Sequence, residues 1–236
     1  MKNIFHSEDV NFFRDFTNFL DARKQSNTEI MDSVRKVIED VKINKDAALI
    51  KYTKKFDMID LDGVGLFFEP KAIEESKRKI ATNYRNAIDL SIARILDFHK
   101  KQMPSNLSWE DELGTQLGWV WKPIDRVGVY VPGGKASYPS SAIMNIAPAK
   151  IAGVEDIVLA SPSPNGHYNP LMIYASSAMD VTKILRVGGA QAIGAMAFGT
   201  ETVDRVYKIT GPGNEYVAEA KRQVFGKIGI DEAFSV

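Results

Sequence analysis

The chain has 236 residues, of which 44% are hydrophobic and 25% charged, so it can bury the core of one large domain or of two modest ones. Its 30 basic residues balance 30 acidic ones, which removes the electrostatic argument for binding nucleic acid or an anionic membrane. Cysteine is absent, so disulfides, thiolate metal sites and cysteine nucleophiles are excluded. Neither a membrane-spanning apolar run nor a signal-peptide core is present, and we expect a cytoplasmic protein.

Residues 1–125 form the first predicted unit, a helical N-terminal region. Apolar residues recur at helical spacing over 27–52, where Asp46 is a candidate break, and again over 71–102. Pro104 and the polar stretch behind it end the second of these helices.

Residues 126–236 form the second predicted unit, in which short β-rich runs alternate with helical segments. Such an alternation predicts parallel strands joined by right-handed crossovers. The fold class is therefore α/β, with the helical region followed by an incomplete Rossmann-like domain. The expected strands are 127–131, 156–160, 183–187 and 205–209, and the expected helices lie near 140–152, 169–179, 190–198 and 214–226.

The loops that follow the expected strands form the candidate binding site, because open parallel sheets bind ligands outside the carboxyl ends of their strands. Three of the four loops are rich in glycine, which permits close approach of a ligand to the backbone. Asn214 is a natural N-cap for the last helix, and such a helix start favours phosphate. The four loops are PGGKASYP (132–139), SPSPNGHY (161–168), GGAQA (188–192) and GPGN (211–214).

Neither general nucleotide motif is complete in these loops. Ala136 follows Gly-Gly-Lys where a P-loop has its magnesium-binding hydroxyl, and Tyr216 occupies the last glycine position of G-x-G-x-x-G. On these motifs alone two readings stay open, a ligand site and the tight turns of an ordinary α/β domain.

Three long segments, taken in order, resemble the histidinol dehydrogenase family: VGVYVPGGKASYPSSAIMNIAPAKIAG, VGGAQAIGAMAFGTETV and KITGPGNEYVAEAKRQVFG. Two N-terminal segments resemble the helical region of the same family, namely VRKVIEDVKINKDAALIKYTKKFD and ILDFHKKQ. The likeness covers roughly 34–231. It implies an architecture like that of the aldehyde dehydrogenases. It also implies an oxidoreductase of histidine biosynthesis, a homodimer that converts L-histidinol to L-histidine with two NAD and one zinc per site.

The resemblance further implies that Tyr130, Gln191 and Asn214 contact NAD. Each lies at or just past the end of an expected strand, where the sheet argument also places a ligand. Without the resemblance, Tyr130 would be a core aromatic, Gln191 a solvated helix start and Asn214 a simple cap. A further polar set either contacts the pyrophosphate or only forms turns, and it consists of Lys135, Ser140 and Ser141.

The family's chain is nearly twice as long as this one, and the sequence departs from the family pattern at Glu232. The resemblance places the zinc ligands, the Glu-His acid/base pair and a substrate-contacting Ser beyond that position. We therefore predict no catalytic residue and no metal ligand in this chain. Of the three scattered histidines, His6, His99 and His167, only His167 is near the expected rim of the site and worth testing.

These observations favour the N-terminal portion of a histidinol dehydrogenase, truncated after its Rossmann-like domain and inactive alone. The alternative is a non-catalytic module that binds a nucleotide or another protein. An unrelated enzyme on the same scaffold has no catalytic constellation to support it. In the family, part of the sheet that helices 30–103 cover comes from the missing half, so we expect their apolar faces to be exposed or to pack on a partner. We then expect aggregation, self-association or reduced stability unless a complementary fragment is present.

Overall fold

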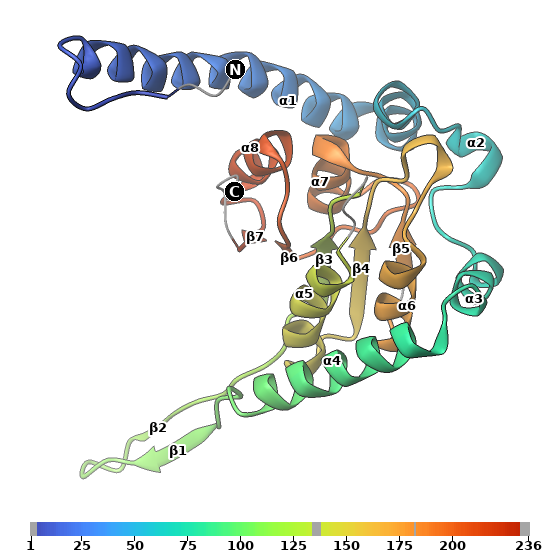
Figure 1. Ribbon diagram of the computed structural model, residues 1–236. Coiled ribbons are helices and arrows are strands. Elements are labelled where there is room, and N and C mark those ends of the chain that lie inside the picture. The colour runs from blue at the N-terminus through green and yellow to red at the C-terminus, as the bar shows by residue number, and fades with distance from the viewer. Residues whose placement is uncertain (1–3, 134–137, 182, 232–236) are drawn as a thin grey trace.

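The computed structural model describes residues 4–133, 138–181 and 183–231, without the side chains of 22–27. A five-stranded parallel sheet lies between two layers of helices (Figure 1). Its order is β5-β4-β3-β6-β7, which is the Rossmann order 3-2-1-4-5 when the strands are counted from β3. The strands are β3 (Arg126–Tyr130), β4 (Asp156–Ala160), β5 (Lys183–Leu185), β6 (Lys208–Thr210) and β7 (Gly229–Ile230).

Four helices cover one face of the sheet. Ile88 and Ile92 of α4 are buried in the same apolar cluster as Val129 and Leu159 of the sheet. The inner pair joins β3 to β4 and β4 to β5, and the outer pair packs on the inner pair. The inner helices are α5 (Pro139–Ile151) and α6 (Pro170–Ala178), and the outer helices are α3 (Pro70–Arg78) and α4 (Thr82–Lys100).

The other face is covered by α7 (Gly189–Phe198) and α8 (Glu215–Val224), with the long helix α1 (Phe12–Asp57) packed on both. Val34, Val41 and Leu49 of α1 belong to the buried cluster that contains Ile193 of α7. The expectation that helices 30–103 present exposed apolar faces is therefore wrong for this stripe of α1, which packs on helices of the sheet. It holds in part for α4, where Tyr84, Leu90 and Phe98 are each more than half exposed.

The expected α/β alternation is confirmed, with strand and helix bounds displaced by only a few residues. The long helix α1 breaks at Lys45, whose φ of 49° and ψ of −125° are not helical, one residue before the expected break. The single helix expected over 71–102 is wrong, because Ala81 is extended and separates α3 from α4. Arg85 stabilises this break by donating to the carbonyl oxygens of Lys77 (2.6 Å) and Ile80 (3.0 Å).

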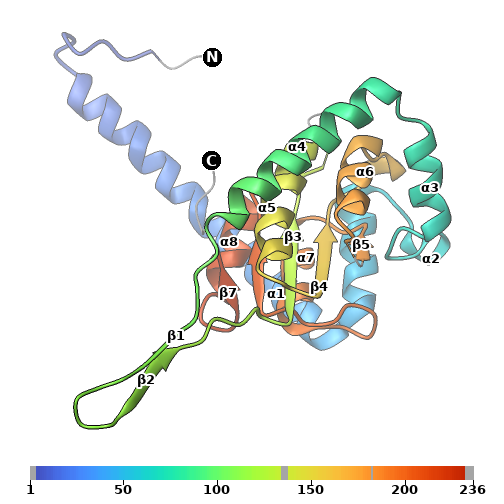
Figure 2. The same cartoon turned by 90° about the horizontal axis from the view of Figure 1, so that it is seen from below.

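Two segments project from the layered body, as Figure 2 shows. One is the N-terminal part of α1. The other is the antiparallel hairpin of β1 (Leu107–Glu110) and β2 (Gln116–Trp119), which the sequence analysis missed. The hairpin is held at its turn by Asp111, whose Oδ1 accepts from the backbone N–H of Leu113 and Thr115, and along its length by the edge-on pair Trp109 and Trp119.

A short helix α2 (Leu61–Val64) follows α1. None of the described helices is both long and apolar enough to cross a membrane.

Candidate functional site at the carboxyl edge of the sheet

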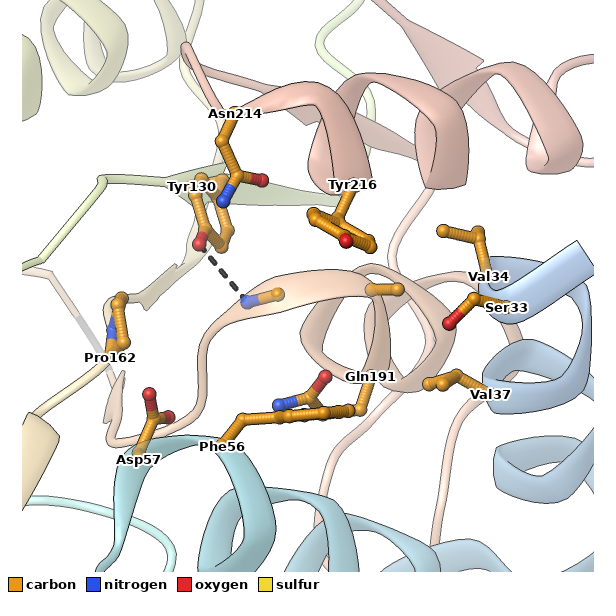
Figure 3. Close-up of a pocket in the computed structure, with 12 residues that line it drawn as sticks. Ser33, Val34, Val37, Phe56, Asp57, Tyr130, Pro162, Gln191, Asn214 and Tyr216 are labelled. Carbon is orange, nitrogen blue, oxygen red and sulfur yellow. Dashed lines mark hydrogen bonds between the residues drawn. The ribbon is translucent and has the colours of Figure 1, made fainter. Parts of the chain in front are cut away.

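A pocket of about 430 Å³ opens at the carboxyl ends of β3 and β6, where the strand order reverses. Open α/β sheets bind their ligands at such a switch point. The walls come from α1, the end of β3, the loop after β4 and the first turns of α7 and α8. Figure 3 shows the lining residues: Ser33, Val34, Val37, Phe56, Asp57, Tyr130, Pro162, Gly189, Ala190, Gln191, Asn214 and Tyr216.

Tyr130 ends β3 and lines the pocket although the residue is only 4% exposed. Its hydroxyl oxygen accepts a hydrogen bond of 3.1 Å from the backbone N–H of Gly189, which leaves the hydroxyl hydrogen to donate. Burial raises the pKa of Tyr130 to about 12, so the phenol stays neutral. The side chain is thus both a core aromatic and a polar group of the pocket wall.

Gln191 is only 2% exposed and lines the pocket from the first turn of α7, so the reading of it as a solvated helix start is wrong. The N-cap of this helix is Gly188, which offers no side chain to the free N–H groups of the first turn. Gly189 has a φ of 63°, and a Cβ there would lie 2.8 Å from Oε1 of Gln191. Because the N–H of Gly189 donates to Tyr130, the N–H groups of Ala190 and Gln191 are the ones left for an anion or another acceptor at the pocket.

Asn214 lines the pocket on the side opposite Gln191 (Figure 3) and is also the N-cap of α8. Its Oδ1 accepts from the N–H of Val217 at 3.1 Å, as a capping residue does. An amide carries donors as well as an acceptor, so the Nδ2 group of a capping Asn still has hydrogens to donate. The capping role of Asn214 is therefore confirmed. It leaves the Nδ2 group able to donate a hydrogen bond to a ligand in the pocket.

The last turn of α1 supplies a wall that the sequence analysis did not identify. Oδ2 of Asp57 is buried, and it has no hydrogen-bond partner among the described residues. Burial raises the pKa of Asp57 to about 6. Because this folded-state pKa lies above the ordinary value, the ionised carboxylate lowers the stability of the fold as pH rises through that range. The only signal in the sequence is an acid at the C-terminal end of a helix, where the helix dipole disfavours it.

The GPGN loop that carries Asn214 is held in place by an ion pair between a buried lysine and a partly exposed aspartate. Nζ of Lys221, a side chain only 2% exposed, donates to the carbonyl of Gly211 and to Oδ1 of Asp231 at 2.6 Å. The second carboxylate oxygen of Asp231 accepts from the N–H of Gly211 at 2.7 Å. Both backbone polar groups of Gly211 are thereby satisfied by side chains.

The remaining candidates that the structure describes do not line the pocket. Lys135 falls outside the described residues, while Ser140 and Ser141 are in the first turn of α5 and are not part of the pocket lining. The histidines are not part of the lining either, and His99 Nδ1 pairs with Oε1 of Gln102 at 2.7 Å. In the part of the chain that the structure describes, no three His, Asp or Glu side chains gather as metal ligands would.

A parallel sheet of Rossmann order, with helices on both faces and a pocket at its switch point, defines the class of doubly wound α/β domains. Residues 20–234 match the family model described as histidinol dehydrogenase. The chain belongs to the histidinol dehydrogenase family.

Individual relatives agree with this assignment. The chain is 46% identical over 220 residues to the histidinol dehydrogenase of Cereibacter sphaeroides, and 45% identical over 223 residues to that of Rhizobium meliloti. These alignments cover 93% and 94% of this chain and 51% of each relative. The crystal structure of histidinol dehydrogenase from Elizabethkingia anophelis superposes with a TM-score of 0.82 at 35% identity, over 87% of this chain and 47% of that one. The chain thus spans about half the length of the curated relatives that it matches.

Proposed function

We propose that this chain supplies the NAD-binding part of a histidinol dehydrogenase, with Tyr130, Gln191 and Asn214 as cofactor contacts. One observation carries the proposal. These three residues come from separate segments of the chain, and all of them line one pocket at the carboxyl edge of the sheet. Two helix N-termini lie beside them, and helix N-termini bind phosphate groups.

Each residue has a distinct task in this proposal. The first turn of α7 binds the pyrophosphate through the backbone N–H groups of Ala190 and Gln191, because the N–H of Gly189 donates to Tyr130 and the N-cap Gly188 offers no competing side chain. Tyr130 donates its free hydroxyl hydrogen, and the amides of Gln191 and Asn214 orient the cofactor. Bound NAD would supply the hydride acceptor for oxidation of an alcohol.

For the complete enzyme we propose the oxidation of L-histidinol to L-histidine by two successive hydride transfers to NAD. The described residues do not fit a zinc site, since no cluster of metal-binding side chains is present among them. We therefore assign no catalytic residue and derive no zinc step from this chain.

A change of Asn214 to Asp tests the proposal, because it separates the cap from the cofactor contact. Aspartate caps a helix as well as asparagine does, so the variant should fold. It loses the Nδ2 donor and places a negative charge beside the pyrophosphate. We expect NAD to raise the melting temperature of the unaltered chain, by an amount equivalent to about 2.7 kcal/mol at a hundredfold excess over Kd. We expect N214D to need an NAD concentration at least about tenfold higher for the same rise in melting temperature.

Asn169→Asp is the matched control, because Asn169 caps α6 through its Oδ1 (2.9 Å from the N–H of Leu171) and does not line the pocket. N169D should respond to NAD like the unaltered chain. An undiminished response of N214D would remove Asn214 from the cofactor contacts. A cooperative melt of the unaltered chain without any response to NAD would overturn the proposed function.

We also propose that the chain self-associates, as the resemblance to a homodimeric family implies. The projecting hairpin supports this, since Trp109, Leu117 and Trp119 are each more than two-fifths exposed. Sedimentation velocity should show a dimer whose population falls in a Trp109→Ser, Trp119→Ser variant. A monodisperse monomer at tens of micromolar chain would contradict it.

A further inference from the structure

We propose that Asp57 recognises the hydroxyl groups of the adenosine ribose of NAD and excludes the 2′-phosphate of NADP. This inference rests on the proposed function, because it concerns the same pocket. It assigns cofactor choice to the long N-terminal helix and not to any loop of the sheet.

The position of Asp57 in the pocket is the first support. The carboxylate lies at the end of α1 and faces the side of the pocket formed by Tyr130 and Pro162 (Figure 3). Its neighbour Phe56 lines the same wall and is half exposed, so an aromatic face lies beside the carboxylate. An acid next to an aromatic surface suits a nucleoside, whose ribose donates hydrogen bonds and whose base stacks.

The charge of the lining is the second support. In a standard Rossmann domain, a carboxylate at the end of the second strand accepts from the ribose hydroxyls, and an arginine there accommodates a 2′-phosphate. Here the second strand, β4, is followed by Ser161-Pro162-Ser163-Pro164, without an acid or a base. Among the described residues that line the pocket, Asp57 is the single carboxylate and no Lys or Arg is present. The described lining therefore offers an acceptor to ribose hydroxyls and no cation to neutralise an additional phosphate.

The cost of Asp57 to the fold is the third support. Its Oδ2 is buried without a partner, and the side chain ends a helix at the pole that repels anions. Burial also raises the pKa of Asp57, which means that the charged form is held at a cost. A residue that breaks local rules without a compensating contact is characteristic of a ligand site.

The test is a titration of the full 236-residue chain with NAD⁺ and, separately, with NADP⁺, for the unaltered protein, for Asp57→Asn and for the control Asp62→Asn. Asp62 is exposed on α2 and lies outside the pocket. Measurement at about pH 8 keeps Asp57 ionised, since that pH lies well above its raised pKa. Calorimetry gives the affinities, and a melt of each protein without ligand reports its folding.

We expect the unaltered chain and D62N to bind NAD⁺ at least about a hundredfold more tightly than NADP⁺. D57N should bind NAD⁺ about tenfold more weakly, bind NADP⁺ more tightly than before, and melt at a temperature no lower than that of the unaltered chain. If D57N keeps both the NAD⁺ affinity and the preference for NAD⁺, Asp57 does not choose the cofactor, although the pocket still binds NAD. If the unaltered chain binds neither cofactor, the proposed function fails and takes this inference with it.

Discussion

Replacement of Gly211 by alanine should lower the free energy of unfolding by about 3–5 kcal/mol and abolish NAD binding. Gly211 has a φ of 110°, and a Cβ at this position would lie 2.0 Å from the carbonyl oxygen of Tyr130. That oxygen belongs to the backbone of a central strand, so the clash can be relieved only by moving the GPGN loop or the end of β3. Either movement displaces Asn214 or Tyr130 from the pocket wall.

Gly226→Ala is the matched control for this variant. Gly226 also has a positive φ, of 80°, but a Cβ there would meet nothing within 4 Å. It should cost only the conformational strain, about 1 kcal/mol, and leave NAD binding intact. Chemical denaturation of both variants measures the difference. Equal losses of stability in the two proteins would show that close approach to Tyr130 is unimportant.

Replacement of Lys221 by methionine should destabilise the chain by about 3 kcal/mol and weaken NAD binding. Methionine fills a similar volume but leaves the carbonyl of Gly211 without its donor and the carboxylate of Asp231 without its cation. The variant therefore removes a cation from beside a carboxylate that is only partly exposed. The GPGN loop would lose its only side-chain donor among the contacts described for Gly211.

Two further variants separate the ion pair from a general effect of charge. Lys227→Met removes an exposed lysine from the same segment and should change the stability by less than about 0.5 kcal/mol. The double variant Lys221→Met, Asp231→Asn also removes the negative charge that Lys221 neutralises, so it should regain part of the loss. If the double variant is no more stable than K221M, the charge of Asp231 is not the source of the cost.

The sheet and its helices could be predicted because their signals are local. The runs 127–131 and 156–160 are almost wholly apolar, as strands buried on both faces must be, and they form β3 and β4 nearly as expected. The break between α3 and α4 was missed because it depends on Arg85 reaching back to carbonyl groups of the preceding turn. The periodicity of apolar residues carries no information about such a contact.

The sequence predicted the pocket wall formed at the strand ends, but not the wall formed by α1. The loops after the strands indicated where Tyr130, Gln191 and Asn214 would converge, because parallel strands end at the same edge of a sheet. The wall formed by Phe56 and Asp57 could not be found in this way. It reaches the pocket through the packing of α1 on α7 and α8, which joins residues far apart in the sequence.

Hydrogen–deuterium exchange of the chain with and without NAD⁺ is the sharpest test of a cofactor site in this pocket, because it locates the binding site as well as detecting it. We expect slower exchange on addition of NAD⁺ at the start of α7, in the GPGN loop with the first turn of α8, and at the end of α1. The hairpin of β1 and β2 should be unchanged. Protection confined to other segments, or no protection at saturating NAD⁺, would contradict a cofactor site at the carboxyl edge of this sheet.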